Sequence, residues 1–175
     1  RALDPMCGRA VVLVEAALSW PGSSFLGVDI DPAQLAGAAS NARLLGLGGA
    51  GGGRVDLVLG DAQALPLPSG SIDAVICDIP FGIQYCSVES CRGGLYDAWF
   101  REFDRVVVPG EGGRAVVLSS AEQEPWVLRA AGLPAPAGSD AAGGGAAGTP
   151  QGRWVCAARR ELKLGALDAV IVALR

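Results

Sequence analysis

Hydrophobic and polar positions alternate between two kinds of segment along this chain. Short runs that are apolar at nearly every position, such as SFLGVD at 24–29 and IDAVICD at 72–78, are typical of strands covered on both faces of a sheet. Longer segments, such as VVLVEAALSW at 11–20, are long enough and apolar enough for buried helices. The alternation predicts repeated strand–helix units, which pack as a mainly parallel sheet with helices on both faces.

The predicted fold class is α/β, a doubly wound Rossmann-like domain. Five alternating strands are expected, at 2–3, 24–29, 55–61, 72–78 and 114–120. Helices are expected at 11–20, 33–45, 95–107 and 122–132, the second of them after Asp31, an N-cap with Pro32 at the first helical position. Two last segments, 154–162 and 167–175, flank a KLGA turn and predict an antiparallel hairpin that completes a seven-stranded sheet.

Length and composition indicate one domain over residues 1–175. Half of the residues are hydrophobic, which suffices for a substantial core. The glycine-rich segment 46–53 is expected to be a flexible connection, and 135–152 a flexible low-complexity insert. No run reaches the roughly 18 apolar residues of a membrane span, and the first residues lack signal-peptide features. We therefore expect an intracellular protein, in the nucleus or the cytoplasm.

The side chains available for chemistry are limited by the absence of histidine. Without it, Ser/His/Asp and Cys/His catalysis and histidine metal sites are excluded. Five cysteines show no repeated short pairing; Cys86 and Cys91 could offer two thiolates to zinc, but a closed site requires four ligands. We expect ordinary reduced thiols and no metal. Chemistry here must use carboxylates, backbone groups and a cofactor.

The net charge of −4 does not favour a domain that binds nucleic acid unaided, because phosphate neutralisation needs a basic face. Arginines and lysines could still form local patches, although scattered solvated charges are equally consistent with the sequence. Two such groups stand out, namely Arg92, Arg101 and Arg105, and Arg159, Arg160 and Lys163.

Acidic residues recur where the first four predicted strands end. Asp4, Asp29, Asp61 and Asp78 all come at the end of a strand or directly after it. Each alone could simply cap a turn. Because the carboxyl ends of parallel strands meet at one edge, where ligands bind in such sheets, together they predict a binding site.

The turn after the first strand indicates what this site binds. DPMCGRA lacks the G-x-G-x-x-G spacing of a dinucleotide site, which disfavours a pyrophosphate ligand. Asp29 lies 21 residues beyond Gly8 and suits a ribose diol, since one carboxylate accepts from both hydroxyls. A ribose-containing cofactor without phosphate, and with positive charge to place among acids, is S-adenosylmethionine.

Four stretches carry a family resemblance: LDPMCG, GVDID, GDAQALPLPSGSIDAVICDIPFG and KLGALDAVIVAL. They resemble the methyltransferase domain of the THUMP-domain-containing RNA guanine-N2 methyltransferases. The resemblance implies a class I S-adenosylmethionine-dependent fold that methylates the exocyclic N2 of guanosine in transfer RNA or small nuclear RNA. The cofactor-binding residues that it implies are Asp4, Met6, Cys7, Gly8, Asp29, Ile30, Asp61 and Ala62.

The catalytic residues implied are Asp78, Ile79, Pro80 and Phe81, in the sequence DIPFG. The lone pair of an exocyclic amine is delocalised into the base, so the amine is a poor nucleophile. The Asp78 carboxylate and the Ile79 carbonyl could hold its two hydrogens and aim the lone pair at the methyl group. Pro80 would stiffen the turn, and Phe81 would stack on the base, which contributes about 1–3 kcal/mol on comparable platforms.

The chain departs from the family in the glycine turn, which usually reads C-G-x-G-T. Here Ala10 and Val11 stand in place of the glycine and the threonine. One alternative is therefore a degenerate domain that keeps the fold and acts as a scaffold in an RNA-binding protein. Another is an N6-adenine methyltransferase, which shares the D-x-P-aromatic chemistry.

The resemblance also implies partners. RNA would be bound mainly by a THUMP module outside this chain, which we expect to be a fragment of a longer protein. Relatives pair with a small zinc-binding methyltransferase activator subunit. The third strand, at 55–61, is expected at the sheet edge with apolar side chains on both faces, so the activator could dock there by strand addition. The preceding glycine-rich loop could equally cover that edge.

Overall fold

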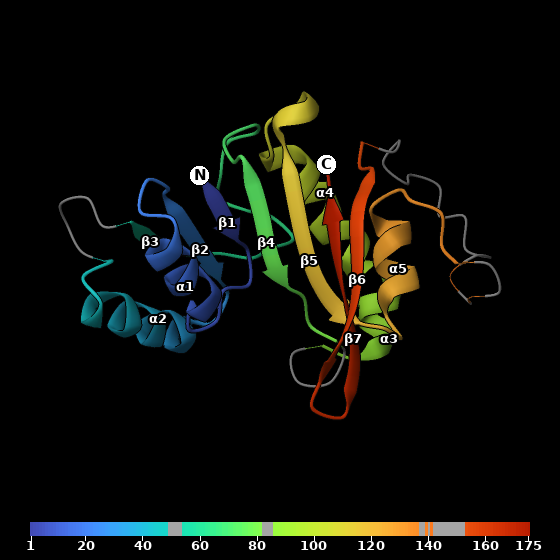
Figure 1. Cartoon of the computed structure of the whole chain (residues 1–175), viewed down its shortest axis with the longest axis horizontal. Helices are drawn as coiled ribbons and strands as arrows, with labels where there is room; N and C mark the ends of the chain where they lie inside the picture. Colours follow the sequence, from blue (N-terminus) through green and yellow to red (C-terminus); the bar gives the residue numbers. More distant parts are fainter. Residues whose placement is uncertain (49–53, 82–85, 137–138, 140, 142–152) are drawn as a thin grey trace.

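The computed structural model describes residues 1–48, 54–81, 86–136, 139, 141 and 153–175. Its centre is a seven-stranded sheet of order β3-β2-β1-β4-β5-β7-β6 (Figure 1), in which β7 alone runs opposite to the other six strands. The predicted fold class is confirmed. The strands are β1 Ala2–Asp4, β2 Phe25–Asp29, β3 Val55–Leu59, β4 Ala74–Asp78, β5 Arg114–Ser120, β6 Cys156–Leu164 and β7 Leu167–Leu174.

Five α-helices connect the described strands: α1 Val11–Ser19, α2 Pro32–Leu44, α3 Val88–Ser90, α4 Tyr96–Val106 and α5 Glu124–Ala130. α2 begins as predicted, because the Asp31 side chain accepts from the Ala33 amide at 2.8 Å and Pro32 follows at the first helical position. The boundaries of the predicted elements shift by at most two residues.

The segment between the predicted strand at 72–78 and the predicted helix at 95–107, where no helix was expected, contains two helical turns. Ser87 caps α3 by accepting from the Ser90 amide at 3.1 Å, and the π-helical turn η1, Cys91–Leu95, continues into α4. The two consecutive glycines inside this turn hid its helical character, since glycine is typical of loops. Gly94 takes a positive φ of 125° there, a conformation open to glycine.

The two faces of the sheet have separate hydrophobic cores. α1 and α2 pack over β1–β3, with Leu13, Phe25 and Val55 buried between the layers. On the opposite face α4 buries a stripe that includes Phe100 and Phe103, because its large apolar residues recur every three or four positions. Strands that are covered on both sides must be apolar on both sides, which explains the continuous hydrophobic runs in the sequence.

The first strand of the closing hairpin is shifted by two residues from its predicted position, and the turn is shorter than predicted. β6 continues through Lys163 and Leu164, so the turn is Gly165-Ala166, and Gly165 supplies its positive φ of 64°. As predicted, β3 forms one edge of the sheet, and β6 forms the other. Within the described ranges, none of the helices combines the length and the hydrophobicity that a membrane crossing requires.

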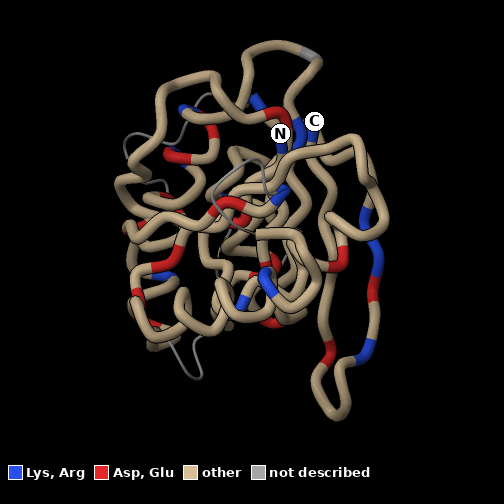
Figure 2. The backbone as a smooth tube through the Cα atoms, turned by 90° about the vertical axis from the view of Figure 1, so that its left-hand side faces the viewer, with Lys and Arg blue, Asp and Glu red and all other residues tan. Residues whose placement is uncertain are grey.

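The basic residues of the two candidate patches are largely paired with acids. Arg92 contacts Glu122 at 2.7 Å and Lys163 contacts Asp168 at 3.0 Å; Arg105 and Arg159 also pair with glutamates. Figure 2 shows acidic and basic segments interspersed over the backbone. The structure thus favours scattered, neutralised charges over basic patches.

Candidate active site

The carboxyl ends of the parallel strands open into one cavity of about 640 Å³. This volume falls within the range of small-molecule sites, which runs from about 300 to 1,000 Å³. All twelve residues predicted from the sequence line it. They are Asp4, Met6, Cys7, Gly8, Asp29, Ile30, Asp61, Ala62, Asp78, Ile79, Pro80 and Phe81.

The three acids at the ends of the first strands hold the turns that shape the cavity. Asp4 accepts from the Met6 amide at 3.1 Å, and Asp61 accepts from the Gln63 amide at 2.8 Å. Asp29 joins two turns, because one carboxylate oxygen accepts from the Gly8 amide at 2.7 Å and the other from the Asp31 amide at 2.9 Å. Capping a turn and lining a site are therefore combined in the same side chains.

Asp4 is the most unusual acid of the site, since it lines the cavity and is nevertheless buried. Burial raises its pKa to about 7; the Met6 amide opposes the shift, while the nearby negative charges of Asp78 and Asp29 add to it. Burial also raises the pKa of the Cys7 thiol to about 12, and Asp4 and Asp29 add to that shift. Such a site favours a cationic ligand, whose charge would relieve the repulsion among the carboxylates.

In the turn after β1, where Ala10 replaces the glycine of the family pattern, the backbone keeps a conformation that is typical of glycine. Ala10 has φ 59° and ψ 29°, the left-handed region, and is the only non-glycine residue with positive φ in the described chain. Its amide donates to the Cys7 carbonyl at 2.7 Å, and its methyl group is fully buried. The turn therefore closes, and α1 begins at the next residue, despite the departure from the family pattern.

The turn after β4 presents the predicted catalytic residues to the same cavity. Asp78 ends the strand and lines the cavity, and partial burial raises the pKa of its carboxyl. The Ile79 amide donates to the Leu118 carbonyl of β5 at 3.1 Å, and the Ile79 side chain is buried in the core. Pro80 and Phe81 follow on the cavity wall, while Gly82 of the same motif lies outside the described residues.

Sequence reasoning missed part of the lining. Leu95, the last residue of η1, and Trp99, in the first turn of α4, both line the cavity; they are four positions apart and so on one helix face. Their helical spacing was visible, but the same spacing predicts core packing, and nothing in the sequence separated the two roles. Further residues not predicted are Pro5, Arg9, Val11, Val12, Asp31, Gln34 and Gln63.

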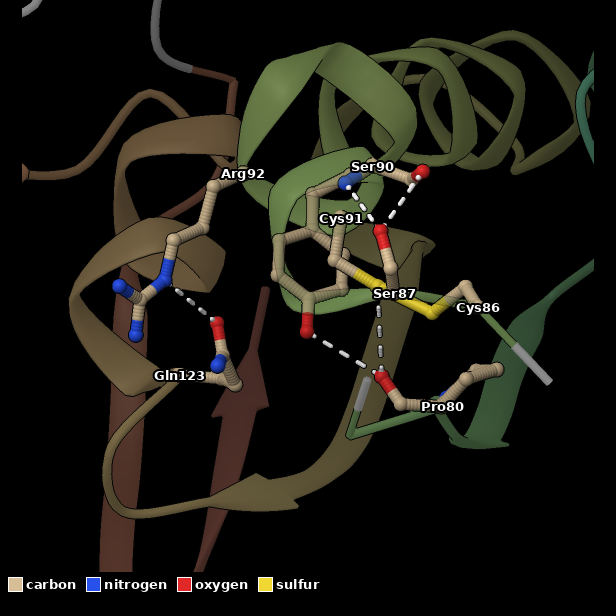
Figure 3. Close-up of a disulfide and its surroundings, with 8 residues drawn as sticks. Pro80, Cys86, Ser87, Ser90, Cys91, Arg92 and Gln123 are labelled. Carbon is tan, nitrogen blue, oxygen red and sulfur yellow. Dashed lines mark hydrogen bonds between the residues drawn. A yellow bond between two sulfur atoms is a disulfide. The ribbon is translucent and has the colours of Figure 1, made fainter. Parts of the chain in front are cut away.

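The prediction of reduced thiols is wrong for one pair of cysteines. Cys86 and Cys91 form a disulfide beside the 78–81 turn (Figure 3). The helical turn between them brings their Cα atoms to 6.6 Å, within reach of a disulfide, which five positions of extended chain would not do. Cys7, Cys77 and Cys156 are free. Over the described part of the chain, no three metal-ligating side chains gather in one place.

The lining fits S-adenosylmethionine chemically. Its sulfonium and amino groups suit a cavity whose strand ends carry four carboxyl groups, and a ribose diol suits Asp29, whose oxygens have lone pairs left after the backbone bonds. Ile30 is an apolar side chain left 69% exposed on the rim, where an adenine could cover it. Arg9 also lines the cavity, and the aliphatic part of its side chain packs against α2, with its Cγ 3.3 Å from the position that a Cβ on Gly37 would take.

This sheet order, with an acidic cavity at its carboxyl edge, is that of class I S-adenosylmethionine-dependent methyltransferases. Solved structures agree: TrmN from Thermus thermophilus superimposes with a TM-score of 0.71 at 23% identity, over 99% of this chain and 43% of TrmN. A methyltransferase from Methanosarcina mazei does so with a TM-score of 0.68 at 15% identity, over 99% of this chain and 90% of its own. These likenesses concern the fold.

The chain belongs to the RMKL-like methyltransferase domain family, whose model matches residues 1–131. Among curated relatives, mouse U6 snRNA (guanine-N(2))-methyltransferase THUMPD2 is 40% identical over 118 residues, 67% of this chain and 20% of that protein. Human tRNA (guanine(6)-N(2))-methyltransferase THUMP3 is 36% identical over 124 residues, 67% of this chain and 24% of that protein. The chain thus spans about a fifth to a quarter of these relatives.

Proposed function

We propose that this chain is the catalytic domain of an RNA methyltransferase that transfers a methyl group from S-adenosylmethionine to the exocyclic N2 of guanosine in transfer RNA or small nuclear RNA. One observation carries the proposal: the 78–81 turn opens into the same cavity as the three acids of the cofactor side. The names of the relatives support the choice of guanine N2. RNA would be bound mainly by a THUMP module outside these 175 residues, inside the cell.

S-adenosylmethionine, the methyl donor, would be held on the side of the cavity where Asp4, Asp29 and Asp61 accept hydrogen bonds from backbone amides. Asp4 and the turn of Met6, Cys7 and Gly8 would lie at the methionine end. Asp29 and Ile30 would hold the ribose and the adenine, and Asp61 with Ala62 the adenine edge. When bound, S-adenosylmethionine supplies an electrophilic methyl group on a sulfonium.

The substrate side would position the amine. The Asp78 carboxylate and the Ile79 carbonyl accept its two hydrogens, and Phe81 stacks on the extruded base. Positioning is the main catalytic contribution, because a well-oriented neighbour lowers a barrier by about 7–11 kcal/mol. A histidine base is unnecessary, since the amine becomes acidic once it is methylated and then readily loses its proton.

The alternative of an inactive scaffold rests on the altered glycine turn. Because Ala10 adopts the left-handed conformation and its amide still bonds to Cys7, the backbone of that turn is retained. Val11 lines the cavity with an exposed side chain rather than filling it. These features favour the enzyme over the scaffold.

Mass analysis of the methylated nucleoside tests the proposal. The chain, alone and with a zinc-binding activator subunit, is incubated with S-adenosylmethionine and with transfer RNA or U6 small nuclear RNA transcripts. We expect N2-methylguanosine; N6-methyladenosine would support the adenine alternative instead. Asp78→Asn should lower the rate by about 100-fold or more, as for a lost preorganised polar group, with cofactor affinity within twofold. The matched control is Asp168→Asn, on an exposed carboxylate of β7. Absence of both product and cofactor binding would refute the enzyme.

The two edges of the sheet differ in a way that supports the partner proposal. β6 carries four charged residues along its nine positions, seen as alternating blue and red segments on the projecting hairpin in Figure 2. Among the five residues of β3 only Asp56 is charged, and Leu59 is 58% exposed. Charged side chains block strand addition. We therefore propose that the activator subunit adds a strand at β3; the loop residues 49–53 that could cover this edge lie outside the described residues.

Replacement of Leu59 by Lys tests this docking. The charge on the β3 edge should abolish co-elution of the activator in size-exclusion chromatography, while a matched change on β6, Leu164→Lys, should leave it intact. Loss of co-elution with both variants, or with neither, would contradict docking at β3.

A further inference from the structure

The carbonyl group of Pro80, in the 78–81 turn, accepts a hydrogen bond from a buried side chain of α4. The Tyr96 hydroxyl donates to it at 3.2 Å, and the Cys91 sulfur, which has no hydrogen to donate in the disulfide, lies 4.0 Å from the same oxygen (Figure 3). Tyr96 is the first residue of α4, 16 positions along the chain from Pro80. The turn is thus fixed to a different element of the fold, not only to its own strand.

Tyr96 cannot itself touch a substrate. Its side chain is 1% exposed, and although its neighbours Leu95 and Trp99 line the cavity, Tyr96 does not. Its ring packs against Trp99 at 5.6 Å between centroids, which fixes the direction of the hydroxyl. Burial raises the pKa of the phenol to about 12, so that it stays a hydrogen-bond donor at every physiological pH.

The two hydrogen bonds of the turn lie on either side of the Ile79 carbonyl. Before it, the Ile79 amide donates to Leu118 of β5 at 3.1 Å; after it, the Pro80 carbonyl accepts from Tyr96. The proline ring fixes φ at Pro80, and the bond from Tyr96 restricts its ψ. Together these restraints fix the peptide plane that carries the Ile79 carbonyl.

We infer that Tyr96 is a positioning residue for methyl transfer: by anchoring the Pro80 carbonyl it aims the Ile79 carbonyl at the target amine. The inference rests on the proposed function of this turn, in which that carbonyl accepts one amine hydrogen. A tilted carbonyl would leave the amine rotated and its lone pair misdirected, and small misplacements of reacting groups slow catalysis strongly.

Tyr96→Phe tests the inference, because it removes only the hydroxyl. We expect the single-turnover rate of methyl transfer, at saturating S-adenosylmethionine and in reducing buffer, to fall about tenfold with cofactor affinity unchanged within twofold. The matched control is Phe103→Leu, which removes core packing from the same helix far from the turn. It should lower the melting temperature at least as much while keeping the wild-type rate.

A second measurement does not depend on activity. Native-state hydrogen exchange of the Ile79 amide should accelerate about tenfold in Tyr96→Phe and stay unchanged in Phe103→Leu. A wild-type methylation rate in Tyr96→Phe overturns the inference even if this amide exchanges faster. If the unmodified chain transfers no methyl group, exchange alone decides whether Tyr96 anchors the turn, and unchanged exchange overturns that anchoring. The proposed function itself fails only if the unmodified chain also does not bind S-adenosylmethionine.

Discussion

Asp4 should make this domain less stable as the pH rises. In the folded state its pKa lies at about 7, against an ordinary value of 3.8, so between these values the folded chain binds more protons than the unfolded one. The contribution of Asp4 to the free energy of unfolding is therefore fully present below pH 3.8 and is lost as the pH rises through 7. Each pH unit in this window corresponds to about 1.4 kcal/mol, which gives roughly 3 kcal/mol between pH 5 and pH 8.

Asp4→Asn removes the ionisation while keeping an oxygen for the Met6 amide. In urea unfolding of the cofactor-free chain, the variant should gain about 3 kcal/mol over the wild type between pH 5 and pH 8, or about 6–12 °C in melting temperature. Asp168→Asn, an exposed acid paired with Lys163, serves as the control and should show no such gain. If the unfolding free energies of Asp4→Asn and the wild type run parallel from pH 5 to pH 8, the reasoning on burial is refuted.

Substitutions at three further positions test the local packing. Gly27→Ala should cost about 1–3 kcal/mol in urea unfolding, because the new methyl group would lie 2.7 Å from the Cys7 sulfur between β2 and the turn. Glu124→Gln should cost about 1–3 kcal/mol, because the buried glutamate pairs with Arg159 at 2.7 Å; a loss below 0.3 kcal/mol would argue against this pairing. Ala10→Val should lower the free energy of unfolding by about 2 kcal/mol or more, because a β-branched residue is strained in the left-handed conformation of this position. Ala10→Gly should change it by less than about 1 kcal/mol. Thermal melts measure both changes.

Much of the fold follows from local patterns that the tertiary structure reinforces. The β2 segment is apolar at nearly every position because it contributes to both cores, Phe25 to one and Leu26 and Val28 to the other. Asp31 and Pro32 begin α2 through a cap that needs no distant partner. The acids could be placed on one rim because parallel strands end at one edge, whatever the details of packing.

The errors share a different cause. η1 contains two glycines, and it is helical as a continuation between α3 and α4, which its own residues do not indicate. The bond between Cys86 and Cys91 required that same path to be known. Likewise Tyr96 and Trp99 are both buried residues of α4. Trp99 lines the cavity and Tyr96 does not, and this difference could be seen only once the position of the cavity was known.

The unequal edges of the sheet also limit how copies of this domain could associate. A strand lattice that grows without end needs two receptive edges on each molecule. The charges of β6 oppose further strands, and only β3 receives one in the docking proposed above. On that proposal, strand addition between two copies would use β3 of each, about a twofold axis, and such a pair is closed. Crowding of the isolated domain should thus yield dimers rather than fibres.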